Sequence, residues 1–405
     1  MLDLVKIRDL ASNNQSPFYI FDLDEFQGRL RDMQEILGAD VQLAYAMKAN
    51  PFLVHAASEL PVKFEVCSPG EFAICERERI DMKRIILSGV NKEKADIEHT
   101  MDACGGVGTY TVESVQQFLL LDRCATERKM HINVLLRVTS GNQFGLDEDN
   151  IREIVEKREA YPYVHILGLQ AYTGTQKKKF EIVEKEIDWL DGLCDELKEK
   201  YGFVATEFEY GPGLKVDYFG KDAYNNNFDE LKKLSKKLDS IRAKYHITLE
   251  IGRYMAATCG MYVTSVADIK VNKGQNYCLV DGGINHVNYY GQTMAMKIPA
   301  YTYIHEDGTV INGDDVTASS KEKWTIVGSL CTVADVIVKN LPIGTPALGD
   351  TLIFYNVGAY SITEAIYLFL SRKMPKVLSY SSKDGVQVYR GVVDADRINS
   401  RQSTL

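Results

Sequence analysis

Short runs of β-branched and aromatic residues recur along the first two thirds of the chain, at intervals of roughly 20 to 40 residues, the length of one strand plus one helix. The stretches between them have helical amphipathicity, and the one that starts at Phe180 ends on Gly202, as a helix C-terminus commonly does. Eight such repeats in about 225 residues favour a closed parallel (β/α)8 barrel, a TIM barrel, over an open sheet. We place its strands near residues 41–47, 64–67, 84–88, 106–111, 131–138, 164–172, 204–210 and 246–251.

The pattern changes after about residue 265, where strand-like runs follow one another closely and helical spacers become rare. Turn signals such as Asp307-Gly308 and Asn312-Gly313 separate these runs. This texture predicts an antiparallel β domain, and residues 18–23 are expected to add a strand to it before the chain enters the barrel. The expected organisation is α/β, with a barrel of residues 25–265 and a C-terminal β domain of residues 266–405 that also includes residues 1–24.

Composition excludes several classes of protein. The chain has 405 residues with 47 basic and 56 acidic side chains, a net charge of −9, which argues against nucleic-acid binding. No run approaches the roughly 18 apolar residues of a membrane span, and the N-terminus has no signal-peptide core, so we expect a cytoplasmic protein away from membranes. The eight cysteines are scattered without a Cys-x-x-Cys pair, so we expect reduced thiols and no metal site. The two basic runs, 177–180 and 231–238, are interpreted as solvated helix faces.

Charged and small residues follow several of the predicted barrel strands, at the end where barrels carry their active sites. Small-residue turns expose backbone N–H groups to an anion, and arginine adds a charge-assisted fork. A partly desolvated lysine forms Schiff bases with carbonyl compounds. Each feature alone is common in proteins, but the combination indicates an aldehyde that carries a phosphate, pyridoxal 5′-phosphate (PLP). The residues are Lys48, Arg137, Tyr172–Thr175, Gly211–Gly213, Glu250 and Arg253.

Six short motifs, in this order along residues 18–370, resemble those of the fold-type III PLP-dependent amino-acid decarboxylases, a family that includes ornithine and diaminopimelate decarboxylases and shares its fold with alanine racemase. The resemblance implies the alanine racemase-like architecture of a barrel plus a β domain. The motifs are Tyr-Ala-Met-Lys-Ala-Asn (45–50), Phe-Glu-Val-Cys-Ser-Pro-Gly-Glu (64–71), Gly-Leu-Gln-Ala-Tyr-Thr-Gly-Thr-Gln (168–176), Glu-Ile-Gly-Arg (250–253), Gly-Ser-Leu-Cys (328–331) and Gly-Ala-Tyr (358–360).

The resemblance implies a role for each matching residue. Lys48 would hold PLP as a Schiff base, and Glu250 would keep the pyridine nitrogen protonated so that the ring accepts electrons when CO2 departs. Cys331 would protonate the resulting carbanion, reaching across from the partner subunit of a homodimer with shared active sites. Arg137 and Glu65 would lie beneath the cofactor, and Tyr172 would stack on its ring. The phosphate would be held by Thr175, Gly211, Gly213, Gly252, Arg253 and Tyr360.

Three departures from the family pattern bear on the cofactor and the substrate. Tyr172 replaces the usual ring-stacking histidine, and Pro212 removes one N–H donor from the glycine turn. Thr332 stands where an acidic residue usually reads a distal amine, and no arginine occurs between Arg253 and Arg372 to read a distal carboxylate. Neither ornithine nor diaminopimelate is therefore favoured. The chain is more similar to a subgroup that acts on acylated or carrier-protein-linked amino acids in antibiotic and siderophore biosynthesis, and residues 285–290, rich in Tyr and Asn, suit an uncharged amide.

Four alternatives stay open. The first is a decarboxylase of free diaminopimelate, ornithine or lysine. The second is an amino-acid racemase on the same fold, although residues 328–332 fit the decarboxylases better. The third is an inactive homologue that binds a partner protein, against which stands the presence of every proposed cofactor residue. The fourth concerns an acyl carrier protein as partner: residues 177–179 offer a basic face, but a solvated helix start explains them more simply.

Overall fold

The computed structural model describes residues 2, 4–289, 295–315 and 321–401. The chain divides into two compact units. The barrel unit comprises Arg29–Lys215 and Phe228–Gly252, and the β unit comprises Met1–Gly28, Val216–Asn227 and Arg253–Leu405. The segment Val216–Asn227 therefore groups with the β unit, whereas the boundaries expected from the sequence placed it in the barrel. Each unit is described by itself.

The barrel unit contains eight parallel strands that pair in sequence order and close on themselves, as the sequence predicts. The barrel closes where the first of them pairs with the last, with Tyr45 opposite Ile251. Each of the eight predicted runs overlaps one observed strand. The strands are β2 (Val41–Ala46), β3 (Lys63–Val66), β4 (Ile85–Leu87), β5 (Thr109–Val112), β6 (Ile132–Arg137), β7 (Val164–Tyr172), β8 (Glu207–Gly211) and β9 (His246–Ile251).

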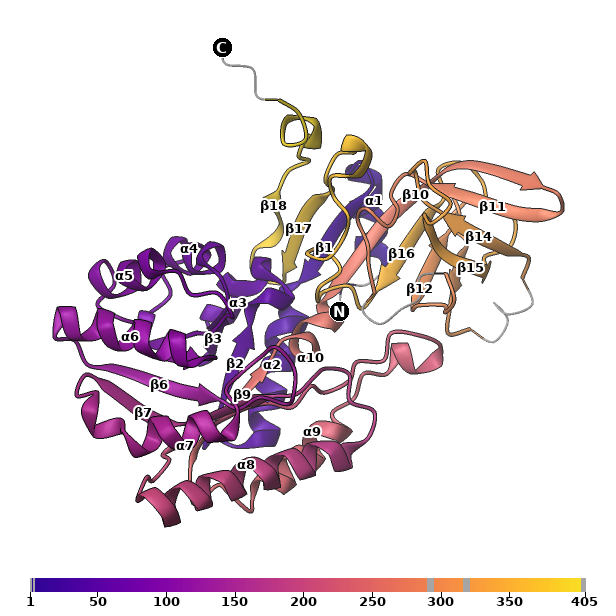
Figure 1. Ribbon diagram of the computed structural model, residues 1–405. Coiled ribbons are helices and arrows are strands. Elements are labelled where there is room, and N and C mark those ends of the chain that lie inside the picture. Colours follow the sequence, from indigo (N-terminus) through magenta and orange to yellow (C-terminus); the bar gives the residue numbers. More distant parts are fainter. Residues whose placement is uncertain (1, 3, 290–294, 316–320, 402–405) are drawn as a thin grey trace. The chain divides into compact units, whose positions relative to one another are not determined.

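Helices lie outside these strands (Figure 1). The predicted helix from Phe180 is present: it buries Val183, Ile187 and Leu190 on one face and ends at Gly202, whose φ of 63° is the left-handed conformation that glycine adopts without strain. The basic run 231–238 is solvated as expected, because its leucines are buried while most of its lysines are exposed. The helices are α2 (Leu23–Leu37), α3 (Val54–Ser58), α4 (Pro69–Arg77), α5 (Lys94–Asp102), α6 (Val115–Arg128), α7 (Glu148–Glu156), α8 (Phe180–Tyr201) and α9 (Asp229–Leu238).

The β unit is built on a ten-stranded sheet, in which the predicted strand at 18–23 takes a central place between two neighbours. Most pairs are antiparallel, but β1–β17 and β11–β14 are parallel, so the sheet is mixed. In both parallel pairs the two strands are distant in sequence. No hairpin connects them, so an antiparallel direction is not imposed. The strands are β1 (Phe18–Asp22), β10 (Gly260–Asn272), β11 (Gln275–Val280), β12 (Tyr301–Ile304), β13 (Val310–Asn312), β14 (Lys323–Val327), β15 (Val336–Pro342), β16 (Thr351–Tyr355), β17 (Lys376–Ser381) and β18 (Gly385–Arg390).

The helix α1 (Leu4–Asn13) covers part of this sheet, because its Ile7 packs into a core cluster with Phe18, Ile20 and Val263. The very short helix α10 (Arg253–Ala256) leads from the last barrel strand into the long strand β10. Among the described residues, no helix combines the length and the apolar character needed to cross a membrane.

Candidate active site

Lys48 follows β2, in a single 3-10 turn at Met47–Ala49. Parallel pairing of β2 with β3 places Ala46 opposite Glu65, which brings the glutamate to the same end of the barrel as the lysine. Lys48 Nζ lies 2.8 and 2.5 Å from the two carboxylate oxygens of Glu65 and 3.6 Å from Cys67 Sγ. The structure thus brings together two of the predicted residues and adds a thiol.

In this cluster the pKa of Glu65 is lowered, whereas the pKa of Cys67 is raised. Burial raises the pKa of Glu65, but Lys48, the Cys67 thiol and Arg137 outweigh it and hold that pKa below its usual value. Burial and the Glu65 charge raise the pKa of Cys67 well above its usual value, so Cys67 is a neutral thiol that donates to Glu65 Oε1 over 2.8 Å. Glu65 is therefore a buried carboxylate that orients an amine, while Cys67 acts as a hydrogen-bond donor and not as a thiolate nucleophile.

Glu250, near the end of β9, belongs to a second buried carboxylate cluster. Gln170 on β7 donates to Glu250 Oε2 over 2.7 Å, and Glu209 on β8 shares a hydrogen bond with Glu250. Burial and the charge of Glu250 raise the pKa of Glu209 well above its usual value, so Glu209 holds the proton and donates it to Glu250. Two neighbouring groups therefore orient the Glu250 carboxylate from two different strands.

Arg137 ends β6, and its Nη1 donates to Glu113 Oε1 over 2.8 Å. Its guanidinium lies 5.0 Å from the ring centroid of Phe144. Both members of the ion pair are largely buried, which fixes the arginine at the strand end because a lone buried charge would be costly. Its direct partner is Glu113, and it acts on Glu65 only through its charge.

The two predicted anion-binding turns lie against each other. A Cβ on Gly213, whose φ is 62°, would lie 2.1 Å from the carbonyl oxygen of Gly174, and a Cβ on Gly211 would meet the ring of Tyr172. The amide of Lys177 donates to Gly213 O over 3.0 Å, which ties the ends of the two turns. Glycine is therefore required at both positions for the turns to approach this closely. Thr175 lies within the first turn and is half-buried.

Glu186 on α8 fixes these turns from outside the barrel. Its carboxylate accepts hydrogen bonds of 2.5 Å each from Thr173 Oγ1, Lys177 Nζ and Tyr210 OH. The expectation that residues 177–180 form a solvated helix face is wrong for Lys177, whose side chain is only 8% exposed, because it pairs with Glu186 inside the protein. Lys178 and Lys179 are exposed as expected.

In the β unit, Arg253 is buried and makes two aromatic contacts. Its Nη1 donates to Tyr218 OH over 2.9 Å, and its guanidinium lies 4.3 Å from the ring centroid of Tyr360. Tyr360 has a φ of 65°, a left-handed conformation that costs energy for a residue other than glycine and that is often found at functional sites. Two residues that the sequence assigned to the same phosphate are thus in contact with each other. Gly252, which precedes Arg253, leaves room beside Ala46 O, where a Cβ would lie 3.0 Å away.

Cys331 is exposed in the loop after β14, beside the half-buried Thr332. The buried carboxylate of Asp335 holds the loop, because it accepts hydrogen bonds from the backbone amides of Leu330 (2.7 Å) and Ile284 (2.9 Å). A Cβ on Gly328 would collide with this carboxylate, so the glycine makes room for it. Of the segment 285–290, Asn285 is buried in the β unit, and Tyr290 lies outside the described residues.

Several residues of these clusters escaped the sequence reasoning. For Gln170, Glu186 and Glu209 the available signal is a polar side chain inside a strand or helix, which is costly when buried unless it has a partner or a function; the others lie in loops and carry no such signal. The pattern Leu-Gln-Ala and Phe-Glu-Tyr within predicted barrel strands carries that signal. The residues are Glu113, Gln170, Glu186, Glu209, Tyr218 and Asp335.

The residues of the barrel unit fit PLP. Among the described residues, Glu250 Oε1 is buried without a hydrogen-bond partner, as expected for an acceptor reserved for a protonated pyridine nitrogen. Lys48 supplies an amine at the same end of the barrel, and the turns at 172–175 and 211–213 bring small residues close together, as an anion-binding turn needs. An amine, a buried carboxylate and small-residue turns are the groups that a Schiff base, a pyridine nitrogen and a phosphate would need.

The family model for "Pyridoxal-dependent decarboxylase, pyridoxal binding domain" matches residues 23–257, more than half of the chain. The chain therefore belongs to this family. It is a PLP-dependent amino-acid decarboxylase, a carboxy-lyase.

The curated relatives cover nearly the whole chain at low identity. The chain is 25% identical to L-glutamyl-(BtrI acyl-carrier protein) decarboxylase of Niallia circulans, covering 92% of this chain and 91% of the relative. It is 26% identical to 2-((L-alanin-3-ylcarbamoyl)methyl)-2-hydroxybutanedioate decarboxylase of Staphylococcus aureus, with 89% and 93% covered. The crystal structure of diaminopimelate decarboxylase from M. jannaschii superposes with a TM-score of 0.84 at 22% identity, covering 98% of this chain and 94% of that one. This likeness shows the fold, a TIM barrel with a mixed β domain.

Proposed function

We propose that the enzyme decarboxylates an α-amino acid whose side chain ends in an uncharged acyl or amide group, or is linked to a carrier protein. The observation that carries this proposal is the neutral Thr332 beside Cys331, in a stretch without arginine from residue 254 to 371. A distal ammonium or carboxylate would need an opposite charge to offset its desolvation, which Thr332 does not supply. Two relatives support the proposal, since their names give an acyl-carrier-linked glutamyl group and a carbamoyl-linked alanyl group as substrates.

In this mechanism PLP, when bound, supplies an electron sink for the electrons released as CO2 leaves. Lys48 is the residue that holds the cofactor, and Glu65 orients its amine. Glu250 would offer Oε1 to the ring nitrogen, and the proton on Glu209 and the amide of Gln170 orient the Glu250 carboxylate. The Cα–carboxylate bond breaks and its electron pair stays on the substrate side; Cys331 Sγ then donates a proton to Cα.

The remaining residues bind and orient. We assign ring stacking to Tyr172 and support beneath the cofactor to Arg137 with Glu65. Phosphate contacts are assigned to Thr175, Gly211 and Gly213 in the barrel unit. Gly252 and the contacting pair Arg253 and Tyr360 are assigned to the same phosphate.

We also propose that the enzyme is a homodimer with shared active sites. Cys331 is exposed, and the neighbouring Val333 is 99% exposed. A second exposed apolar segment comprises Leu368, Phe369 and Leu370. A partner copy that receives the Cys331 loop would account for this exposure.

Subunit complementation tests the shared site. Lys48→Ala and Cys331→Ala are each expected to keep about 1% of wild-type activity or less as homodimers. Unfolded and refolded together in equal amounts, they should recover about one quarter of wild-type activity, because half of the dimers are mixed and each of these has one intact site. A mixture that forms mixed dimers but stays as inactive as its components would show that both residues act within one chain.

The substrate proposal is tested by CO2 release from two sets of α-amino acids. One set is free ornithine, lysine and diaminopimelate; the other is their forms acylated only at the distal nitrogen, with the α-amino group free, and γ-glutamyl amides, free or attached to a carrier protein. Turnover of only the acylated set is expected. If a free diamino acid reached a kcat/KM of order 10⁴ M⁻¹s⁻¹ or better, the acyl proposal would be abandoned. Loss of optical rotation without CO2 would instead indicate a racemase.

Two finer proposals concern the surroundings of the enzyme. All eight cysteines lie among the described residues and are free, which supports a reducing compartment such as the cytoplasm. If the substrate is carried by an acyl carrier protein, the exposed Lys178 and Lys179 are its contact points, because carrier proteins are acidic; Lys177 is paired internally and is left out.

A further inference from the structure

Three metal-ligating side chains converge on the surface of the barrel unit. They are Glu76 on α4, His99 in the last turn of α5, and Cys104 two residues after that helix ends. His99 Nε2 lies 2.8 Å from Glu76 Oε1, and Cys104 Sγ lies 3.7 Å from the same oxygen. All three ligand atoms lie within 4.8 Å of one another. No sequence motif indicates this cluster, because Glu76 is more than twenty residues away from the other two.

The spacing suits a small divalent ion with little rearrangement. Zinc binds nitrogen and oxygen at about 2.0–2.2 Å and sulfur at about 2.3 Å, which places tetrahedral ligand atoms roughly 3.3–3.8 Å apart. The contact between Cys104 and Glu76 already lies in this range, and the Glu76–His99 contact needs to lengthen by less than an ångström. A set of one thiolate, one imidazole and one carboxylate leaves a fourth position open for water or another ligand.

The surroundings favour a cation. Within the described part of the chain, Glu76 forms no ion pair with lysine or arginine, so an incoming metal ion displaces only protons. Burial and the Glu76 carboxylate raise the pKa of the Cys104 thiol, and a bound divalent charge would reverse that effect. The ring of Phe72 makes an edge contact with the His99 ring at 6.0 Å between centroids, which restrains the imidazole.

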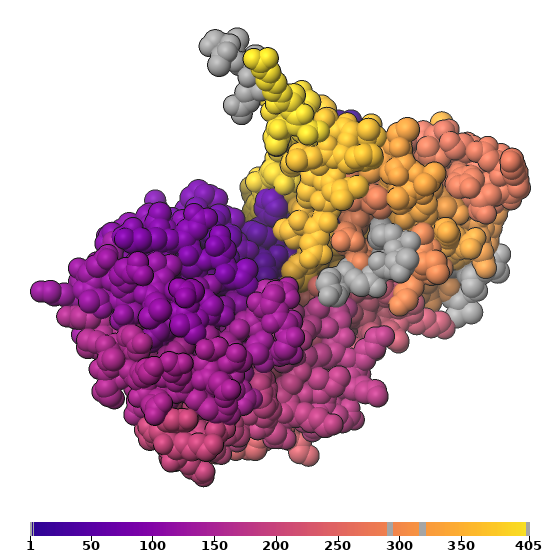
Figure 2. All heavy atoms as spheres, in the orientation of Figure 1, coloured from indigo at the N-terminus to yellow at the C-terminus, as the bar shows by residue number. Residues whose placement is uncertain are grey.

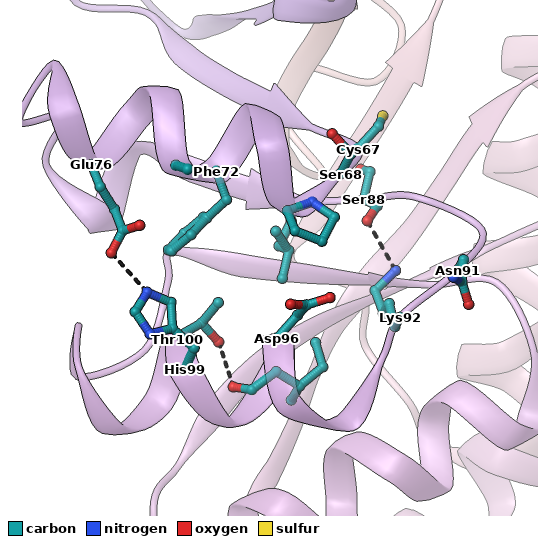
Figure 3. A pocket seen from close by; sticks show the side chains of 14 residues that line it. Cys67, Ser68, Phe72, Glu76, Ser88, Asn91, Lys92, Asp96, His99 and Thr100 are labelled. Atoms are coloured by element: carbon teal, nitrogen blue, oxygen red, sulfur yellow. Dashed lines mark hydrogen bonds and ion pairs between the residues drawn. The ribbon is translucent and has the colours of Figure 1, made fainter. Parts of the chain in front are cut away.

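The site is accessible from a cavity and from the surface. Figure 3 shows Glu76 and His99 turned toward each other at one end of a cavity of about 220 Å³, with Phe72 beside them and Lys92 at the other end. The part of the chain that contains α4 and α5 lies on the face of the barrel unit visible in Figure 2. An ion bound by the three side chains would have a route from solvent and a pocket beside its open position.

We propose that Glu76, His99 and Cys104 form a binding site for a borderline divalent metal ion of the zinc type. The site lies outside the proposed catalytic residues, so it is independent of the proposed substrate. It runs against the expectation of no metal site, which rested on cysteine spacing alone. A side-chain set assembled from two helices has no spacing signature in the sequence.

The test is a Co²⁺ titration of the purified, untagged holoenzyme, with Zn²⁺ affinity measured by calorimetry. One ion per chain is expected, with the visible d–d bands of tetrahedral Co²⁺ lying at longer wavelength than the cofactor absorbance. Zn²⁺ should then displace the Co²⁺ and abolish these bands. Cys104→Ser, His99→Ala and Glu76→Gln should each weaken binding by more than the roughly 10–100-fold that loss of an outer-shell partner costs.

The chain provides matched controls. His55 pairs with Glu78 at 3.0 Å on the same surface but has no thiol beside it, so His55→Ala should leave the titration unchanged. Cys331→Ser controls for the exposed thiol of the β unit. The proposal is overturned if no tetrahedral Co²⁺ spectrum develops, or if Cys104→Ser binds the ion as tightly as the wild type. Circular dichroism of each variant separates loss of ligand from loss of fold.

Discussion

The barrel mouth and the Cys331 loop hold their polar groups in opposite ways. At the barrel mouth, Glu65, Glu209 and Glu250 are enclosed by strands, and each is oriented by a neighbour in the same unit. In the β unit, Cys331 is exposed on a loop that the buried carboxylate of Asp335 ties to the segment after β11. A closed barrel can therefore fix charges within one chain, whereas the loop offers its thiol outward.

We expect the largest loss of activity from Lys48→Ala, at the barrel mouth. The substitution removes the amine that Glu65 orients, so PLP should no longer be held covalently and its visible absorbance band should be lost. Activity should fall by a factor on the order of 10³ or more, about 4 kcal/mol of transition-state stabilisation. Absorbance spectroscopy and CO2 release check this together.

The exposed Lys83→Ala is the matched control and should behave as the wild type. A Lys48→Ala enzyme that kept full activity and the absorbance band would refute the assignment of Lys48. Borohydride reduction followed by peptide mapping then identifies the lysine that holds the cofactor.

Cys331→Ala and Asp335→Ala test the role of the Cys331 loop. Cys331→Ala should keep cofactor binding but slow product protonation by roughly a hundredfold, the size of a general-acid contribution. Asp335→Ala leaves two amides without acceptors, so it should also destabilise the β unit by about 2–6 kcal/mol. Single-turnover kinetics and thermal unfolding separate the two effects. Equal unfolding temperatures for both variants would mean that Asp335 does not hold the loop.

Much of the barrel followed from the sequence because strand, helix and turn signals agreed there. All eight strand positions and the glycine end of α8 were predictable from local periodicity and capping. The β unit was harder. The strand-like runs at 261–271, 275–283, 323–328, 351–358 and 386–393 overlap β10, β11, β14, β16 and β18, whereas β12, β13, β15 and β17 were not predicted. Strand β13 has only three residues, and Lys339-Asn340 interrupts the apolar run of β15. The parallel pairing of β1 with β17 depends on long-range topology, which no local pattern encodes.

The predicted site residues came from motif positions at strand ends, and the structure shows contacts for Lys48 with Glu65 and for Arg253 with Tyr360. The motifs did not indicate the residues that hydrogen-bond to the predicted site residues and orient them. The proton on Glu209 arises because two carboxylates from adjacent strands are buried together, a property of the closed barrel and not of either segment. Lys177 was misinterpreted for the same reason, since its partner Glu186 lies on the following helix.

Glu186→Gln tests whether a residue outside the barrel supports the phosphate turns. The amide keeps the shape of the side chain but loses the ion pair with Lys177 and one acceptor for Thr173 or Tyr210. A charge-assisted hydrogen bond is worth about 1.5–3 kcal/mol, so the dissociation constant of PLP should rise by up to roughly ten- to a hundredfold. Fluorescence titration of the apoenzyme with PLP measures it.

Glu181→Gln, on an exposed position of the same helix, should leave PLP affinity unchanged. The turns at 172–177 and 211–214 would be shown to hold themselves together if Glu186→Gln bound PLP as tightly as this control. In that case the backbone bond from Lys177 to Gly213 alone would be sufficient.

The smallest expected effect concerns Lys92, which is partly buried in the barrel unit and, among the described residues, has no carboxylate in direct contact. Its Nζ donates to the carbonyl oxygens of Ser88 (3.2 Å) and Gly89 (2.8 Å) and to Gln117 Oε1 (3.3 Å). Burial lowers the pKa of Lys92 to about 8, whereas the unfolded chain retains a pKa of 10.5. Between these values the unfolded state binds more protons, so this lysine destabilises the fold below pH 8 and ceases to do so as the pH rises toward 10.5.

Lys92→Met removes this titration. The quantity to compare is the unfolding temperature of the wild type minus that of Lys92→Met. This difference should increase by on the order of a few degrees from pH 8 to pH 10.5. Differential scanning calorimetry at matched protein concentration measures it, with the exposed Lys83→Met as control. A difference that stayed constant or decreased over this range would mean that Lys92 stays charged when buried, held by its three oxygen acceptors.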